Sequence, residues 1–208
     1  MENIILGFLT GGSLILVIGP QNLFVIEQGL KKSFVFTVTT ICTISDIFLI
    51  FLGIFIYHIF SFISLEIEII LNIILILFLT RFVKNKFDEL KNNYKLKKIK
   101  QSQKIRNIIL KTLGFTYLNP HVYSDTVFFL GNFSKNFFIT HKYLFGLGAS
   151  IASFIFFFAL GYLSKFLSKY SNNVKTWDAI NTFIIMFMGS LALYILIEIF
   201  INIRNYFD

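Results

Sequence analysis

Residues 4–26 read "IILGFLTGGSLILVIGPQNLFVI", an apolar run that ends in a glycine, a proline and two amide side chains. A helix of about 20 apolar residues is long enough to cross a hydrocarbon core of about 30 Å. Gly19 and Pro20 break helices, and the amides of Gln21 and Asn22 need hydrogen-bond partners. The stretch therefore predicts a transmembrane segment that is broken near its end. No basic residue precedes the run, which is also long for a secretory signal, so we interpret it as part of the mature protein.

The composition extends this interpretation to the whole chain. Of its 208 residues, 56% are hydrophobic and 14% are charged, and the mean hydropathy is +0.74. Soluble domains have roughly 25% charged residues, so the fold class is predicted to be an all-α integral membrane protein. The apolar runs predict six transmembrane helices: Ile4–Ile26, Phe34–Ile59, Leu65–Val83, Ile108–Gly131, Tyr143–Phe166 and Trp177–Ile201.

The basic residues predict an orientation. Sixteen of the nineteen Lys and Arg residues lie in or beside the connections after spans one, three and five. Basic residues in short loops mark the cytoplasmic side, so the basic loop 84–107 is expected in the cytoplasm and both termini outside. A chain of five spans would instead place the N-terminus inside. A nucleic-acid arm and a lipid-headgroup anchor are alternatives for the loop, but its position between spans favours a role in topology and no nucleic-acid partner.

The loop divides the chain into two three-helix halves, residues 1–83 and 108–208. An odd number of spans in each half gives the halves inverted topology, an arrangement common in secondary transporters. Pro20 and Pro120 are the only prolines, and each lies in the first span of its half. We therefore hypothesise an inverted repeat.

A second break is predicted at Asn119-Pro120-His121. Backbone groups freed by a break in lipid must be satisfied by protein or water, so breaks are expected where they line a cavity. The amides of Gln21, Asn22 and Asn119 either satisfy these groups or bind a polar ligand. Two ordinary proline kinks with local amide caps are the alternative.

Two carboxylates, Asp46 and Asp125, fall within predicted spans. Asp46 lies twelve residues into its span, about 18 Å deep. Charged residues at this depth face the bundle interior and mark transport pathways. The same helix face carries small and polar neighbours at helical spacing, namely Cys42, Ser45, Leu49 and Gly53. The alternative is a structural ion pair, for which Arg81 is the candidate partner of Asp46.

Other residues favour packing or solvation rather than chemistry. In span five, Gly148 with Ala152 and Ala149 with Ser153 form small-xxx-small pairs that let helices approach closely. Acidic and histidine residues near span ends are expected to be solvated: Glu27, His58, Glu66, Glu68 and Glu198. The single cysteine, Cys42, excludes an internal disulfide. No phosphate-binding loop, HExxH, paired Cys/His set or GxSxG is present in the sequence, so we expect no enzyme, no metal and no cofactor.

Three blocks, "GPQNLFVIEQGLKK" (19–32), "CTISDIFLIFLGIF" (42–55) and "GFTYLNPHVYSDTVFFLGNFS" (114–134), resemble the LysE family of bacterial amino-acid exporters. The resemblance is closest to the branch that exports lysine and arginine, since the branch for neutral amino acids typically carries a PGP-type first motif. The family often has Trp where this chain has Tyr117. The motif positions carried over are Gly19, Pro20, Gln21, Asn22, Ser45, Asp46, Asn119, Pro120, His121 and Asp125.

The resemblance implies a secondary exporter of basic L-amino acids in the bacterial cytoplasmic (inner) membrane. Asp46 and Asp125 would bind the cationic side chain, and amides or backbone N–H groups beside the prolines would bind the carboxylate. Export of a cation from a negative cytoplasm is uphill, so exchange for protons is the expected coupling. The alternatives are an exporter of neutral amino acids or another small metabolite, and a non-transporting membrane scaffold. Because two-fold assemblies are common, a homodimer is a further hypothesis.

Overall fold

The computed structural model describes residues 1–16, 19–60, 65–91, 104–170 and 174–207, and all regular elements within them are helical. The all-α prediction is confirmed for this part of the chain. In chain order the elements are α1 (Glu2–Ile15), α2 (Pro20–Leu30), α3 (Val35–Phe60), α4 (Leu65–Lys91), α5 (Ile105–Tyr117), α6 (Pro120–Tyr123), the π-helical segment η2 (Ser124–Phe129), α7 (Leu130–Ser134), α8 (Ile139–Leu167), η3 (Ser168–Tyr170) and α9 (Val174–Phe207).

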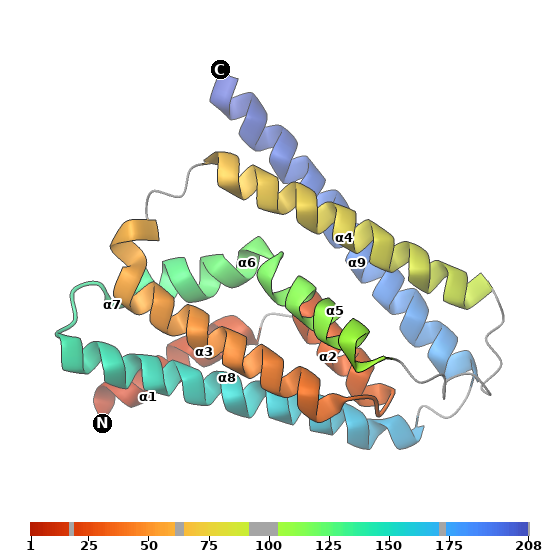
Figure 1. The fold of residues 1–208 in the computed structure, drawn as a ribbon, viewed down its shortest axis with the longest axis horizontal. Helices are drawn as coiled ribbons and strands as arrows, with labels where there is room; N and C mark the ends of the chain where they lie inside the picture. Colours follow the sequence, from red (N-terminus) through yellow and green to blue (C-terminus); the bar gives the residue numbers. More distant parts are fainter. Residues whose placement is uncertain (17–18, 61–64, 92–103, 171–173, 208) are drawn as a thin grey trace.

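The helices form a bundle, and one further pair of helices lies across one side of it. Helix α8 packs against α1, α2 and α3, and α3 also packs against η2, α7 and α5. Helices α4 and α9 pack on each other and lie across one side of this bundle (Figure 1). The broken segments α1–α2 and α5–α7 both belong to the bundle, so both predicted breaks lie within it.

Small residues bring α1 and α8 into backbone contact. A Cβ on Gly148 would overlap the carbonyl oxygen of Ile4, and a Cβ on Gly7 would overlap that of Phe145. A Cβ on Gly11 would lie 2.8 Å from the Cβ of Ala149. The interpretation of small residues in span five as packing positions is therefore confirmed for Gly148 and Ala149.

A cluster of phenylalanines joins α4 to the bundle. The ring of Phe115 on α5 lies 5.0 Å from Phe24 on α2 and 5.0 Å from Phe82 on α4, between ring centroids. Phe78 on α4 completes the cluster at 4.8 Å from Phe115. Phe78 and Phe82 meet Phe115 edge to face, whereas the Phe24 ring is tilted by 34° against it. Aromatic pairs add about 0.5–1.5 kcal/mol each beyond their buried area, so the cluster fixes α4 against α2 and α5.

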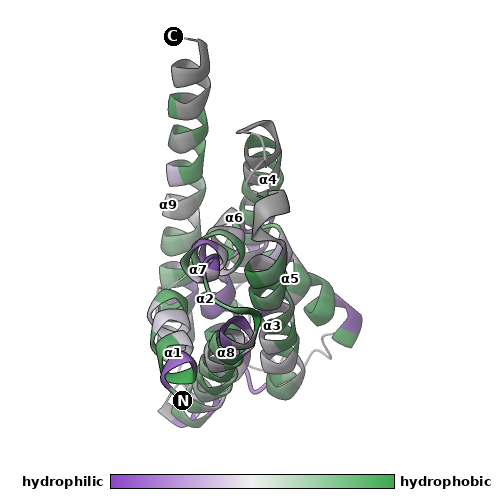
Figure 2. Cartoon of the chain, turned by 90° about the vertical axis from the view of Figure 1, so that its left-hand side faces the viewer, coloured by the Kyte–Doolittle hydropathy of each residue, from purple (hydrophilic) through white to green (hydrophobic). Residues whose placement is uncertain are grey.

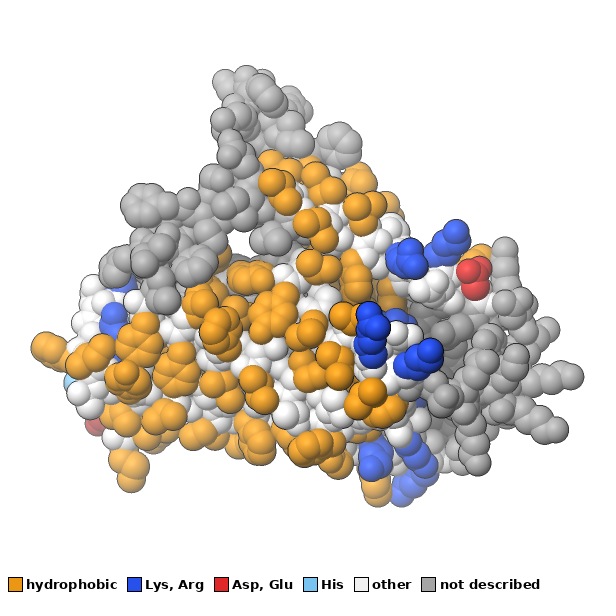
Figure 3. Space-filling model, in the orientation of Figure 1, with side chains coloured by type: hydrophobic (Ala, Val, Ile, Leu, Met, Phe, Trp, Pro, Cys, Tyr) orange, Lys and Arg blue, Asp and Glu red, His pale blue; other side chains and the backbone are white. Residues whose placement is uncertain are grey.

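Three helical stretches in the described residues are long and apolar enough to cross a membrane: Val35–Phe55, Ile139–Leu167 and Asp178–Ile197. The bent pair α1–α2 makes a fourth if it is one span. Hydrophobic residues run along the helices (Figure 2) and cover the middle of the visible face (Figure 3). The chain is thus a multi-pass helical membrane protein. The presence of six transmembrane helices stays a prediction.

The boundaries of the predicted basic loop 84–107 differ from those in the structure. Helix α4 continues to Lys91, because residues 84–91 carry no glycine or proline that would end it. Residues 92–103 lie outside the described part of the chain.

Candidate functional site

The first break separates α1 from α2, whose axes differ by 81°. Gly19 has extended backbone angles (φ −114°, ψ −179°) and Pro20 is the first residue of α2. Proline is favoured at this position, since its missing N–H would have no helical partner there. The amide Nδ2 of Asn22 donates a hydrogen bond of 3.1 Å to the carbonyl of Ile15 at the end of α1. Asn22 therefore caps a carbonyl that the break exposes.

The second break is built in the same way. Helix α5 ends at Tyr117, and Pro120 is the first residue of α6. The hydroxyl of Tyr123 donates a hydrogen bond of 2.9 Å to the carbonyl of Tyr117. In each case a side chain just after the proline reaches back to the helix that precedes the break. Tyr123 lies within the motif 114–134, but nothing in the sequence indicates this role.

Removing the cap at the second break should loosen it. We expect Tyr123→Phe to lower the free energy of unfolding by about 1–3 kcal/mol, because the Tyr117 carbonyl loses its partner. The midpoint of thermal unfolding in detergent measures the change. Tyr194→Phe is the control, since Tyr194 is exposed on α9 and donates no hydrogen bond to the described residues. Equal midpoints for the two variants would contradict the cap.

Asp46 lies at the centre of the bundle between the two breaks. Asp46 is 3% exposed. The hydroxyl of Ser153 on α8 donates a hydrogen bond of 3.1 Å to the Oδ2 atom of Asp46. The Gln21 amide is close enough to interact with both the Asp46 carboxylate and the Cys42 thiol. Even so, Nε2 of Gln21 is buried without a partner of hydrogen-bond geometry among the described residues. A buried donor thus lies beside a buried carboxylate.

The second carboxylate, Asp125, lies on the π-helical segment that follows the second break. It is half-buried, and its charge acts on that of Asp46. Gly53 on α3 lets this segment approach, since a Cβ there would lie 2.6 Å from the carbonyl oxygen of Thr126. Short π-helical segments are rare and are frequent at functional sites. The two acidic residues from different halves of the chain therefore belong to one region.

The structure brings together three of the ten residues selected from the sequence. Gln21, Asp46 and Asp125 interact, and Ser45 and Asn119 are buried. Gly19, Pro20 and Asn22 build the first break. The backbone of Pro120 and His121 starts α6, and their side chains lie outside the described part.

One alternative and one expectation about charged residues differ from the structure. Arg81 is exposed on α4 and forms no ion pair with Asp46, whose described partner is Ser153. Glu27 is buried at 3% exposure instead of solvated. The side chains of His58, Glu66, Glu68 and Glu198 lie outside the described part.

Ser153 is a site residue that the sequence analysis assigned to packing alone. We expect Ser153→Ala to reduce the export that the resemblance implies about tenfold, since a hydrogen bond to a charged group contributes roughly 1.5–3 kcal/mol. Initial transport rates in membrane vesicles measure the loss. Ser150→Ala is the matched control, because the Ser150 hydroxyl donates to the Gly146 carbonyl of its own helix at 2.7 Å. Equal rates for both variants would show that Ser153 only packs.

The arrangement suits a ligand with a positive and a negative group. Two carboxylates offer a partner for a cation, and the Gln21 amide offers a donor. The first turn of α2 also has no side-chain cap, and the N-terminus of a helix favours anions. No group of three or more His, Cys, Asp or Glu residues that could hold a metal ion occurs in the described residues.

Comparison with known proteins identifies a family and several relatives. A family model of LysE-type translocators matches residues 12–199. An arginine exporter protein ArgO of Pectobacterium atrosepticum is 34% identical over 194 residues, covering 90% of this chain and 93% of the relative. Proteins of the same name from Klebsiella pneumoniae (33% identical; 84% of each chain) and Escherichia coli O157:H7 (32% identical; 90% of each chain) are also similar. No solved structure matches the chain.

Proposed function

The chain belongs to the LysE family of translocators, and from this premise we propose that it exports basic L-amino acids, arginine foremost, from the cytoplasm. One observation carries the choice of a cationic substrate: the buried carboxylate of Asp46 lies between two helix breaks and is paired with no cation among the described residues. A charge at this depth is expensive in a membrane protein. A substrate with a cationic side chain would neutralise it.

In the proposed complex the substrate lies between the breaks. Its guanidinium or ammonium group contacts Asp46, with Asp125 as a second acceptor. Its carboxylate accepts hydrogen bonds from the Gln21 amide and from the first turn of α2. Asn119, Ser45 and His121 complete the proposed pathway. This assignment rests on the burial of Asp46 and on the unpartnered amide nitrogen beside it.

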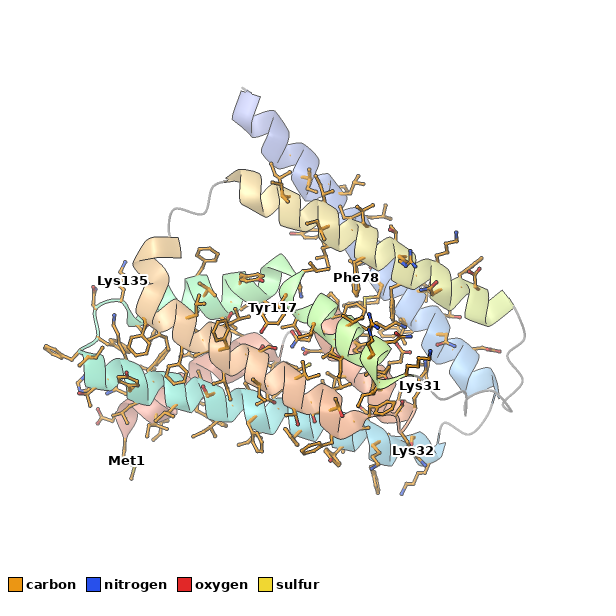
Figure 4. All side chains as sticks on the ribbon, viewed as in Figure 1. Met1, Lys31, Lys32, Phe78, Tyr117 and Lys135 are labelled. Carbon is orange, nitrogen blue, oxygen red and sulfur yellow. The ribbon has the colours of Figure 1, made fainter. Side chains whose placement is uncertain are left out.

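We further propose six spans in two inverted halves, residues 1–83 and 108–208, with the basic loop 84–107 in the cytoplasm. The segments α1–α2 and α5–α7 open the two halves, and each has a proline-started helix whose side chain caps the preceding one. Lys31 and Lys32 lie at the end of the bundle opposite Met1 and Lys135 (Figure 4). Most of the visible Lys and Arg side chains gather at the Lys31 end (Figure 3). This distribution favours that end as the cytoplasmic one.

Proton exchange is the proposed coupling. Moving one positive charge out of a negative cytoplasm costs about 2.3 kcal/mol per 100 mV. Asp46 would bind a proton when the cationic substrate leaves, because either partner neutralises the buried carboxylate. Proteoliposomes test this directly: export should accelerate with an imposed inward proton gradient. Indifference to the gradient would rule out proton exchange.

The substrate class is tested in cells. Bacteria without their own basic amino-acid exporters are fed arginine- or lysine-containing dipeptides, and release of the free amino acids is followed with and without the protein. We expect release to increase for arginine and lysine, and to stay unchanged for threonine from a matched dipeptide. Equal release with and without the protein would contradict the proposed function.

A further inference from the structure

The C-terminal end of α2 holds an ion pair that lies largely inside the bundle. Nζ of Lys31 lies 2.6 Å from Oε1 of Glu27, one helical turn earlier. The Glu27 side chain is 3% exposed and that of Lys31 is 15% exposed. Pairs of this spacing on a water-exposed helix contribute only about 0.3–0.5 kcal/mol. Here the carboxylate is withdrawn from water, so its charge needs a nearby cation.

The surroundings of the pair are tightly packed and polar. Gln28 is 2% exposed, and its Oε1 has no hydrogen-bond partner among the described residues. Gly29 lies directly on α8, since a Cβ there would be 2.6 Å from the carbonyl oxygen of Gly161. The end of α2 therefore buries a carboxylate and, on the next residue, an amide oxygen without a partner among the described residues.

The ion pair lies on the same helix as Gln21, which interacts with Asp46. Glu27 follows Gln21 by six residues on one helix, a rise of about 9 Å. Gln21 interacts with Asp46, whereas Lys31 lies at the end where most of the basic side chains gather (Figures 3 and 4). Glu27 thus lies between the proposed cytoplasmic end and the central carboxylate.

We propose that Glu27 is an entry site for the cationic side chain of the substrate, and that Lys31 is a tethered cation that occupies it between transport cycles. This inference rests on the proposed function and deepens it. The ammonium of Lys31 is the group that a lysine substrate carries. An arginine substrate carries a planar guanidinium, which binds carboxylates bidentately and is less strongly hydrated. Either group can replace Lys31 without leaving Glu27 uncompensated.

In this proposal Lys31 leaves Glu27 by a movement of its own side chain. Its side chain is already the more exposed member of the pair and can turn toward water on a long flexible stem. A cation also remains favourable near the C-terminus of α2, where the helix dipole is negative. The substrate then moves from Glu27 to Asp46, and Lys31 returns.

Everted membrane vesicles test the inference, because their cytoplasmic face is accessible and arginine uptake reports export. We expect Lys31→Met to lower the half-saturating arginine concentration about tenfold, since the tethered competitor is lost. We expect Glu27→Gln/Lys31→Met, which leaves no uncompensated charge, to raise it about a hundredfold above that of Lys31→Met, and therefore about tenfold above that of the original chain. Maximal rates should change little, because Asp46 is intact.

Lys32→Met is the matched control, since it removes the same charge from an exposed neighbouring side chain. A purely structural ion pair would alter the amount of folded protein and its thermal midpoint, and would leave the half-saturating concentration unchanged in every variant. That result would overturn the inference. If Lys31→Met does not fold, the double variant is compared with the original chain. Equal half-saturating arginine concentrations in these two proteins would then contradict the proposal. Absence of arginine uptake by the original chain would instead refute the proposed function.

Discussion

Asp46→Asn is expected to abolish arginine export while the protein still folds and inserts. Asparagine has nearly the same shape and can still accept the hydrogen bond that Ser153 donates to Asp46. It carries no charge, so the cationic group of the substrate would be buried without its main partner. Leaving a buried charge unpaired costs about 3–5 kcal/mol, which corresponds to more than about a hundredfold loss. Initial rates of arginine uptake by everted vesicles, normalised to protein content, measure the effect.

Asp88→Asn is the control, because Asp88 is an exposed carboxylate on α4. It should transport at the original rate. Asp46→Glu should retain part of the activity, since the charge is kept but displaced. Export by Asp46→Asn within a few-fold of the original rate would exclude Asp46 as the central cation acceptor.

Gly148→Ala is expected to disrupt the packing of α1 on α8. The added Cβ would overlap the carbonyl oxygen of Ile4, which belongs to a backbone and has little room to move. Overpacking of this kind typically lowers the free energy of unfolding by about 1–3 kcal/mol. We expect a value near the top of this range, because the overlap is with backbone. The fraction of protein that stays monodisperse in detergent after mild heating reports the loss.

Gly189→Ala on α9 makes the same chemical change in open space, since nothing lies within 4 Å of its added Cβ. It should be neutral or slightly stabilising, because alanine favours helices by up to about 1 kcal/mol over glycine. Equal stability of the two variants would contradict the close contact of α1 and α8.

Features that depend on local chemistry were predictable from the sequence. Gly19-Pro20 and the Asn119-Pro120 pair mark both breaks, because proline and glycine limit helices regardless of their surroundings. The buried face of α3 around Asp46 follows from helical spacing, and its members Cys42, Ser45 and Leu49 are buried as expected. The small residues of α8 indicated close packing for the same reason.

Features that depend on contacts between distant segments were not predictable. Ser153 lies 107 residues from Asp46 in the chain, and helical periodicity gives no information on which helix faces which. The burial of Glu27 beside Lys31 depends on how α8 covers α2. Arg81 was selected because it is close to a span interior in sequence, but α4 turns this residue away from the bundle core. The 81° bend likewise depends on tertiary packing.

The most direct test of the central claim compares arginine with citrulline, its uncharged analogue of nearly equal shape. Purified protein in proteoliposomes is loaded with unlabelled arginine, and exchange for external labelled arginine is competed with either compound. The account predicts that arginine competes, that citrulline does not, and that Asp46→Asn loses arginine exchange. Equal competition by citrulline and arginine in the original protein, or arginine exchange that persists in Asp46→Asn, would contradict a cation site at Asp46.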